Sequence, residues 1–206
     1  MARLIPLNGL IGGEFSLWHV QNSGDTRVGR NGLFLTTSLK MINNIINFCL
    51  FQVGWFVCIL GAAWNYTYVA IIISIGILFL HLYLTDKNAN DIKLSAIAAT
   101  FGFSFDGIMQ FNNMIIYNNP GVPYPFTPIW IVILWILFAI TLNHSLAWLK
   151  GRTSLAMLFG LMGGPLVYLA GEKLMAVTIA NPNTLIVLAI GWAFITPLLI
   201  SFGEKK

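Results

Sequence analysis

Charged residues are scarce in this sequence: they make up only 9% of its 206 residues, whereas 57% are hydrophobic. Soluble globular domains carry about 25% charged residues, so this chain has too few to cover the surface of a water-soluble fold. The composition therefore indicates a polytopic membrane protein. In such a chain the net charge of +4 reports membrane topology and gives no reason to expect nucleic acid binding.

Cysteine and histidine are also rare. Cys49 and Cys58 lie in one apolar run, about 13 Å apart along a helix and on opposite faces, so they cannot form a disulfide with each other. Of the three histidines, His81 and His144 lie near the ends of apolar runs and His19 lies in a polar segment. Because neither a histidine cluster nor a CxxC motif is present, the sequence predicts no metal site and no cofactor.

Long apolar runs are what the chain has in abundance. A helix needs about 20 apolar residues to cross a hydrocarbon core of ~30 Å. Six runs of this kind are separated by short connections: 42–63, 66–84, 94–116, 129–149, 154–177 and 183–202. The predicted fold is all-α, a polytopic bundle of six transmembrane helices.

The positions of the basic residues agree with a division of the chain into six spans. With six spans, both termini and two of the connections share one side of the membrane, and that side holds ten of the eleven Lys and Arg residues. The ten are Arg3, Arg27, Arg30, Lys40, Lys87, Lys93, Lys150, Arg152, Lys205 and Lys206. The positive-inside rule then predicts that both termini are cytoplasmic.

Residues 1–40 differ from the rest in being polar and lacking a long hydrophobic core, so they are not a secretory signal peptide. We expect a weakly ordered cytoplasmic arm, followed by a transmembrane domain over residues 41–206. Met41 stands immediately before the first apolar run, where translation could begin.

Asp106 is the acidic residue nearest the middle of an apolar run. An ionised side chain at the bilayer centre costs roughly 2.5–3.5 kcal/mol, so it has to face other helices or water. Gly102, Gln110 and Asn113 share its helical face by spacing. Two interpretations stay open: Asp106 is a buried, hydrogen-bonded packing residue, or it carries protons or contacts a substrate.

The fifth run is interrupted by Gly163, Gly164 and Pro165. Proline cannot donate to the carbonyl of Leu161, so the helix bends or breaks there. One interpretation is a kinked packing helix, in which Gly160 and Gly164 form a GxxxG contact. The other is a discontinuous helix, whose second half directs its N-terminus at an anionic group.

Further polar residues lie along the runs. Near the outer end of the fifth run, Lys173 can extend toward the headgroups, whereas the shorter Glu172 is expected to face the bundle. Gln52 is placed to reach the same interior as Asp106. Asn47 lies on a stripe of small residues, and His144 on a face suited to hydrogen bonds between helices.

Four stretches resemble a known family: "NFCLFQVGWFVCILGA" (47–62), "GFSFDGI" (102–108), "PIWIVILWILFAITLNHSLAWL" (128–149) and "GLMGGPLVYLAGEKLMAV" (160–177). They are similar to a bacterial inner-membrane family, domain of unknown function 2878. The resemblance implies a small polytopic protein of the bacterial inner membrane whose gene accompanies fatty-acid and phospholipid modifying enzymes. It implies no established activity. The positions that match its motifs are Gln52, Asp106, Gly163, Gly164, Pro165 and Tyr168.

Three functions are compatible with these features. The first is handling or modification of a membrane lipid, or of another hydrophobic substrate, at a polar pocket near the bilayer midplane. The predicted pocket residues are Gln52, Asp106, Gln110, Gly163, Gly164, Pro165, Tyr168 and Glu172, with Asn47, His144 and Lys173 as secondary candidates. Its partners would be membrane lipids, and either lipid-modifying enzymes or a second copy of the chain.

The second function is a small proton-coupled transporter that uses Asp106, and the third is a structural subunit in which polar groups only hold helices together. The sequence has no histidine boxes, nucleophile elbow or nucleotide-binding loop, so it assigns no reaction.

Overall fold

The computed structural model describes residues 26–84 and 89–203, with side chains described from residue 37 onward. The helices are α1 (Thr26–Ala63), α2 (Thr67–Leu84), α3 (Ala89–Phe111), α4 (Ile129–Asn143), the short 3-10 helix η2 (Ala147–Leu149), α5 (Thr153–Lys173) and α6 (Asn183–Gly203). Two short strands, β1 (Ile115–Tyr117) and β2 (Val177–Ile179), complete the described elements. The predicted helical bundle is confirmed.

Five of the described helices are long and apolar enough to cross a membrane: α2, α3, α5, α6 and the part of α1 from Thr37 to Ala63. The chain is therefore a membrane protein by the length and composition of its helices. α4 is equally apolar but has only 15 residues, about 22 Å of helix. Six spans, and termini on the cytoplasmic side, stay predictions.

The fourth helix is shorter than predicted because it ends at Asn143 instead of residue 149. His144 leaves the helical conformation with φ −120° and ψ −95°, and the chain turns before η2. Asn143 and His144, at this end of the helix, form hydrogen bonds with Asp91 of α3. The apolar pattern of the run does not predict these bonds.

The chain divides into two compact units, Met1–Ile42 and Asn43–Lys206. Of the arm predicted over residues 1–40, residues 26–40 form the beginning of α1, and residues 1–25 lie outside the described residues. The membrane-capable helices α2, α3, α5 and α6 lie in the second unit.

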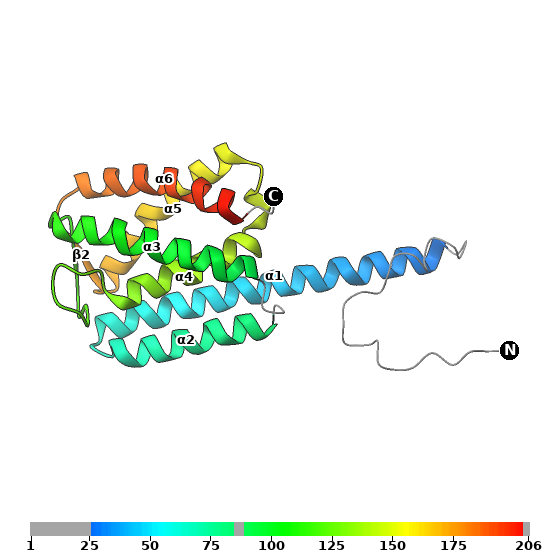
Figure 1. Ribbon diagram of the computed structural model, residues 1–206, viewed down its shortest axis with the longest axis horizontal. Helices are drawn as coiled ribbons and strands as arrows, with labels where there is room; N and C mark the ends of the chain where they lie inside the picture. Colours follow the sequence, from blue (N-terminus) through cyan, green and yellow to red (C-terminus); the bar gives the residue numbers. More distant parts are fainter. Residues whose placement is uncertain (1–25, 85–88, 204–206) are drawn as a thin grey trace. The chain divides into compact units, whose positions relative to one another are not determined.

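Within this unit, α5 packs mainly against α6, and α3 mainly against α4. In Figure 1, α2 and α6 lie at opposite edges of the unit, with α3 and α4 between them. The buried apolar side chains come from all six long helices and from both strands. The core is therefore continuous through the bundle.

α5 runs without interruption through Pro165. The interpretation of this segment as two half-helices is therefore wrong, and it is one helix with an internal proline. Pro197 lies inside α6 in the same way. A helix accommodates such a proline by bending and by satisfying the freed carbonyl elsewhere.

α3 and α5 end in the same motif. Asn113 and Met175 have positive φ values of 54° and 64°. The N–H of the following residue, Met114 or Ala176, donates to the carbonyl five residues earlier. This is the Schellman arrangement, which satisfies the free carbonyls at a helix end. Both helices thus stop before the predicted spans 94–116 and 154–177 end.

The residues after these two ends form the antiparallel pair β1–β2, with Ile115 opposite Ile179 and Tyr117 opposite Val177. β-branched residues favour this extended conformation. The pairing brings Tyr117 into contact with Asp106 of α3, and the pattern of apolar runs did not predict these strands.

Candidate functional site: an aromatic pocket backed by Asp106

Asp106 lies on α3 with no solvent exposure. Its Oδ2 accepts a hydrogen bond from Nε1 of Trp135 at 2.6 Å. Its Oδ1 accepts from the hydroxyls of Tyr117 and Tyr168. Side chains from α4, β1 and α5 therefore meet at one carboxyl group.

All three of these partners donate, and both oxygens of the carboxyl group accept. Burial, followed by the proximity of Asp106, raises the pKa of the Tyr117 hydroxyl well above its ordinary value. Tyr117 therefore keeps its proton and acts as a donor. The fixed carboxylate sets the orientation of Trp135 and of both tyrosines.

The indole of Trp135 also stacks on that of Trp192 from α6, with ring centroids 4.5 Å apart and planes 16° from parallel. Each ring is backed by a glycine. A Cβ added to Gly102 would lie 2.2 Å from Cγ and Cδ1 of Trp135, and one added to Gly164 would lie 2.4 Å from Cγ of Trp192. No side chain fits at either glycine while the indoles keep these positions.

Gly160 contributes to the same contact, because its Cβ would lie 2.1 Å from the carbonyl oxygen of Trp192. The predicted close approach of another helix along Gly160 and Gly164 is thus confirmed, and the helix is α6. Gly163 is different: the nearest atom to its Cβ position is Cε1 of Phe159 at 4.0 Å.

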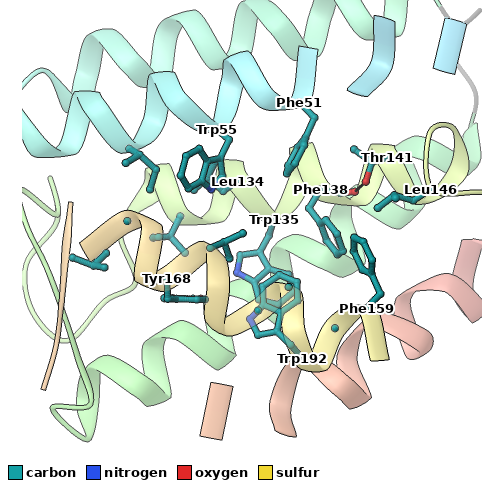
Figure 2. Close-up of a pocket in the computed structure, with 18 of the residues that line it drawn as sticks. Phe51, Trp55, Leu134, Trp135, Phe138, Thr141, Leu146, Phe159, Tyr168 and Trp192 are labelled. Carbon is teal, nitrogen blue, oxygen red and sulfur yellow. Dashed lines mark hydrogen bonds between the residues drawn. The ribbon is translucent and has the colours of Figure 1, made fainter. Parts of the chain in front are cut away.

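A cavity of about 210 Å³ lies between α1, α4, α5 and α6. Figure 2 shows Phe51 and Trp55 of α1 on one side, and Phe159, Tyr168 and Trp192 on the other. The full lining is Phe48, Phe51, Trp55, Ile59, Ile131, Leu134, Trp135, Phe138, Thr141, Leu146, Phe159, Gly160, Gly163, Gly164, Val167, Tyr168, Gly171, Val177 and Trp192.

The cavity wall is apolar, whereas a polar pocket was predicted. Thr141 and Tyr168 carry the only hydroxyls among the lining residues, and both are engaged: Thr141 donates to the carbonyl of Phe138, and Tyr168 donates to Asp106. The rings of Trp135 and Tyr168 face the cavity, while their polar atoms turn away to the carboxylate behind the wall.

The structure separates the predicted pocket residues into groups. Gly163, Gly164 and Tyr168 line the cavity, and Asp106 lies behind the wall. Gln52, Gln110, Pro165 and Glu172 are not among the lining residues.

Two of those four are buried or engaged elsewhere. Gln110 is buried on the same face of α3 as Gly102 and Asp106, as the spacing predicted, and its Oε1 has no hydrogen-bond partner among the described residues. Oε1 of Glu172 accepts from the N–H of Ile179 at 2.9 Å, which ties α5 to β2. Lys173 is exposed.

A second polar cluster centres on Asp91, which lies in the first turn of α3 and is buried. Oδ1 of Asp91 accepts from Nδ2 of Asn143 at 2.8 Å. Its Oδ2 lies 2.8 Å from Nε2 of His144 and 3.5 Å from Nε2 of His81. The cluster is fifteen residues from Asp106, about 22 Å along the helix.

Asn47 joins this second cluster from α1. Its Oδ1 accepts from the hydroxyl and the N–H of Ser145 at 2.6 and 3.2 Å, and its Nδ2 lies 3.4 Å from Nδ1 of His81. The structure therefore places Asn47 and His144 with Asp91, apart from the other candidates.

Several residues of these sites were missed from the sequence: Tyr117, Trp135 and Trp192 around Asp106, and His81 and Asp91 in the second cluster. Aromatic residues are frequent in every run, so no spacing distinguishes the three rings. One feature of the sequence could have predicted the second cluster: an acidic residue, Asp91, stands one turn before an apolar run, and two histidines stand at the ends of other runs.

Composition, helix length and buried polar clusters define the chain as a helical-bundle membrane protein. Residues 44–198 match the family described as "Protein of unknown function (DUF2878)", so the chain belongs to that family. No curated protein and no solved structure matches the sequence. The matched region contains the aromatic pocket and both aspartate clusters.

Proposed function

We propose that this protein binds the acyl chain of a membrane lipid, or a similar apolar chain, in the cavity between α1, α4, α5 and α6. The observation that carries the proposal is the lining of the cavity: aromatic and aliphatic side chains with four glycines of α5, in a bundle whose helices can cross a membrane. Such a wall offers water few hydrogen-bond partners.

The cavity has room for part of an acyl chain. Its volume of about 210 Å³ exceeds the roughly 150 Å³ of an apolar protein cavity that binds benzene. Because the surrounding lipid is itself apolar, the hydrophobic effect gives little preference for the cavity. Selectivity arises from close contact with rigid rings.

Asp106 supports this function indirectly. By accepting hydrogen bonds from Trp135 and Tyr168, it holds two rings of the wall in place. This arrangement favours a positioning role for Asp106 over a role as proton carrier. Each described hydrogen bond of its carboxyl group comes from a buried side chain on α4, β1 or α5.

The lining residues favour binding over reaction at this site, since neither hydroxyl in the wall is free to act on a substrate. Association with lipid-modifying enzymes or with a second copy of the chain remains a prediction.

Photolabelling tests the proposal. The full chain is reconstituted into phosphatidylcholine vesicles that contain a phospholipid with a diazirine on one acyl chain, and labelled residues are identified by mass spectrometry. We expect label on buried residues of the wall such as Phe138 and Tyr168. Gly163→Leu has room at its Cβ and places its side chain in the cavity, so this label should fall several-fold.

The matched control is Leu166→Phe, which enlarges a side chain on the same helix at a position that is 59% exposed. It should leave label in the cavity unchanged. Equal labelling of the wall in the parent and in Gly163→Leu, or label confined to exposed positions, would show that the cavity binds no acyl chain.

A further inference from the structure

We propose that His81, Asp91 and His144 bind one divalent transition-metal ion, of the kind that accepts imidazole nitrogen and carboxylate oxygen together. The proposal is independent of acyl-chain binding, because none of the three residues lines the cavity. Each comes from a different helix end: the last turn of α2, the first turn of α3 and the C-cap of α4.

The spacing of the ligand atoms carries the proposal. One ligand atom from each residue lies within 4.8 Å of the other two, and both Nε2 atoms approach the same oxygen, Oδ2 of Asp91, at 2.8 and 3.5 Å. Ligands 2.0–2.2 Å from a tetrahedral ion lie about 3.3 Å from one another. Small side-chain movements therefore suffice to place an ion among the three atoms.

The carboxylate is oriented for this task by its neighbours. Asn143 donates to Oδ1 of Asp91 at 2.8 Å, which leaves Oδ2 directed at the imidazoles. Asn143 is fixed in turn by Nζ of Lys150, which donates to its Oδ1 at 2.8 Å and to the carbonyl of Gly203 at 3.1 Å. Outer contacts of this kind orient ligands in metal sites.

The ligand set selects the class of ion. Two imidazoles and one carboxylate suit Zn²⁺ and Fe²⁺, whereas Ca²⁺ and Mg²⁺ prefer oxygen ligands alone. Three protein ligands also leave a coordination position for water or another small ligand. The His144 side chain is 20% exposed and those of His81 and Asp91 are 4% and 0% exposed, so an ion has access beside His144.

Asn47 lies beside the other ring nitrogen of His81 and gives a further test. Because Ser145 donates to Oδ1 of Asn47, the amide presents Nδ2 to Nδ1 of His81. Metal binding at Nε2 places the imidazole proton on Nδ1, and an acceptor at the position of the Asn47 amide would favour that form.

Asn47→Asp supplies that acceptor while keeping both hydrogen bonds from Ser145. We therefore expect Asn47→Asp to tighten metal binding by about tenfold or more. If the cluster only joined helices by hydrogen bonds, the change would produce no metal affinity.

The direct experiment uses the full chain, purified in detergent with a histidine-free tag and titrated with Co²⁺, whose visible absorption reports nitrogen and oxygen ligation. Zn²⁺ is then used as the competitor. We expect about one ion per chain. Binding should weaken at least about tenfold in His144→Gln, which keeps a donor to Asp91, and in Asp91→Asn.

His19→Gln removes the remaining histidine of the chain, lies outside the described residues, and should leave binding unchanged. Thermal unfolding provides a second readout: Zn²⁺ should raise the Tm of the parent and of His19→Gln, but not that of His144→Gln. Equal Co²⁺ spectra in the parent and His144→Gln, or no stoichiometric binding by the parent, would overturn the proposal.

Discussion

The Cα of Gly102 lies directly against the indole of Trp135, where an added Cβ would be 2.2 Å from the ring. Trp135 is held from two other directions, by its hydrogen bond to Asp106 and by its stacking on Trp192. The ring therefore has no room to move away from α3. Because Trp135 also lines the cavity, the packing of α3 against α4 fixes part of the cavity wall.

We expect Gly102→Ala to lower the free energy of unfolding by about 1–3 kcal/mol, because the added methyl group overpacks this contact. Thermal unfolding in detergent measures the change. Gly76→Ala is the control: Gly76 has no atom within 4 Å of its Cβ position, so alanine there should be neutral or stabilise α2 by up to about 1 kcal/mol. Equal effects at the two glycines would contradict the packing described for Trp135.

Adjacent glycines of α5 should respond differently to the same substitution. Gly164→Ala forces a methyl group into Trp192 and should destabilise the fold by about 1–3 kcal/mol. Gly163→Ala meets nothing closer than 4.0 Å and should be tolerated. Comparing the unfolding midpoints of the two variants checks this expectation, and a larger loss at Gly163 would mean that α5 is rotated from the orientation described.

Asp106→Asn should lower stability by about 1–3 kcal/mol, because an amide replaces one acceptor with a donor among three donors. A double-mutant cycle with Trp135→Phe measures the coupling. In the Trp135→Phe background the indole N–H is absent, so Asp106→Asn should cost less. Additive effects of the two substitutions would show that the Trp135 hydrogen bond contributes no stability.

Glu172→Gln should change stability by less than about 0.5 kcal/mol, because glutamine keeps an oxygen that accepts from the N–H of Ile179. Glu172→Ala leaves that N–H without its acceptor and should cost about 1 kcal/mol. Urea or thermal unfolding of both variants distinguishes them. An equally large loss in both would mean that the charge of Glu172, and not its hydrogen bond, matters.

Much of the helical fold could be predicted from the sequence. The apolar runs place α2 and α6 within one or two residues of their observed ends, because unbroken apolarity over about 20 residues leaves few alternatives to a helix. The spacing correctly predicted a buried face of α3 at Gly102, Asp106 and Gln110, since such a stripe has no favourable contact with lipid. Asn113, assigned to the same face, lies beyond the end of the helix and is exposed.

The ends of α3, α4 and α5 could not be predicted in this way. Schellman motifs at Asn113 and Met175 are followed by strands whose paired residues lie sixty or more positions apart in the chain, and no local pattern specifies such a pairing. The Gly163-Gly164-Pro165 segment shows the opposite case. Its residues favour a break in the helix, but α5 is continuous there because it packs along α6.

The sequence by itself determined that this protein is a membrane helix bundle, because composition and run length decide whether a chain can be dissolved by water or by lipid. Only the tertiary structure decided what its polar residues contact. Asp106 meets donors from three elements, and Asp91 meets two histidines from two others, because these contacts depend on how helices rotate and pack, which the period of an apolar helix does not encode.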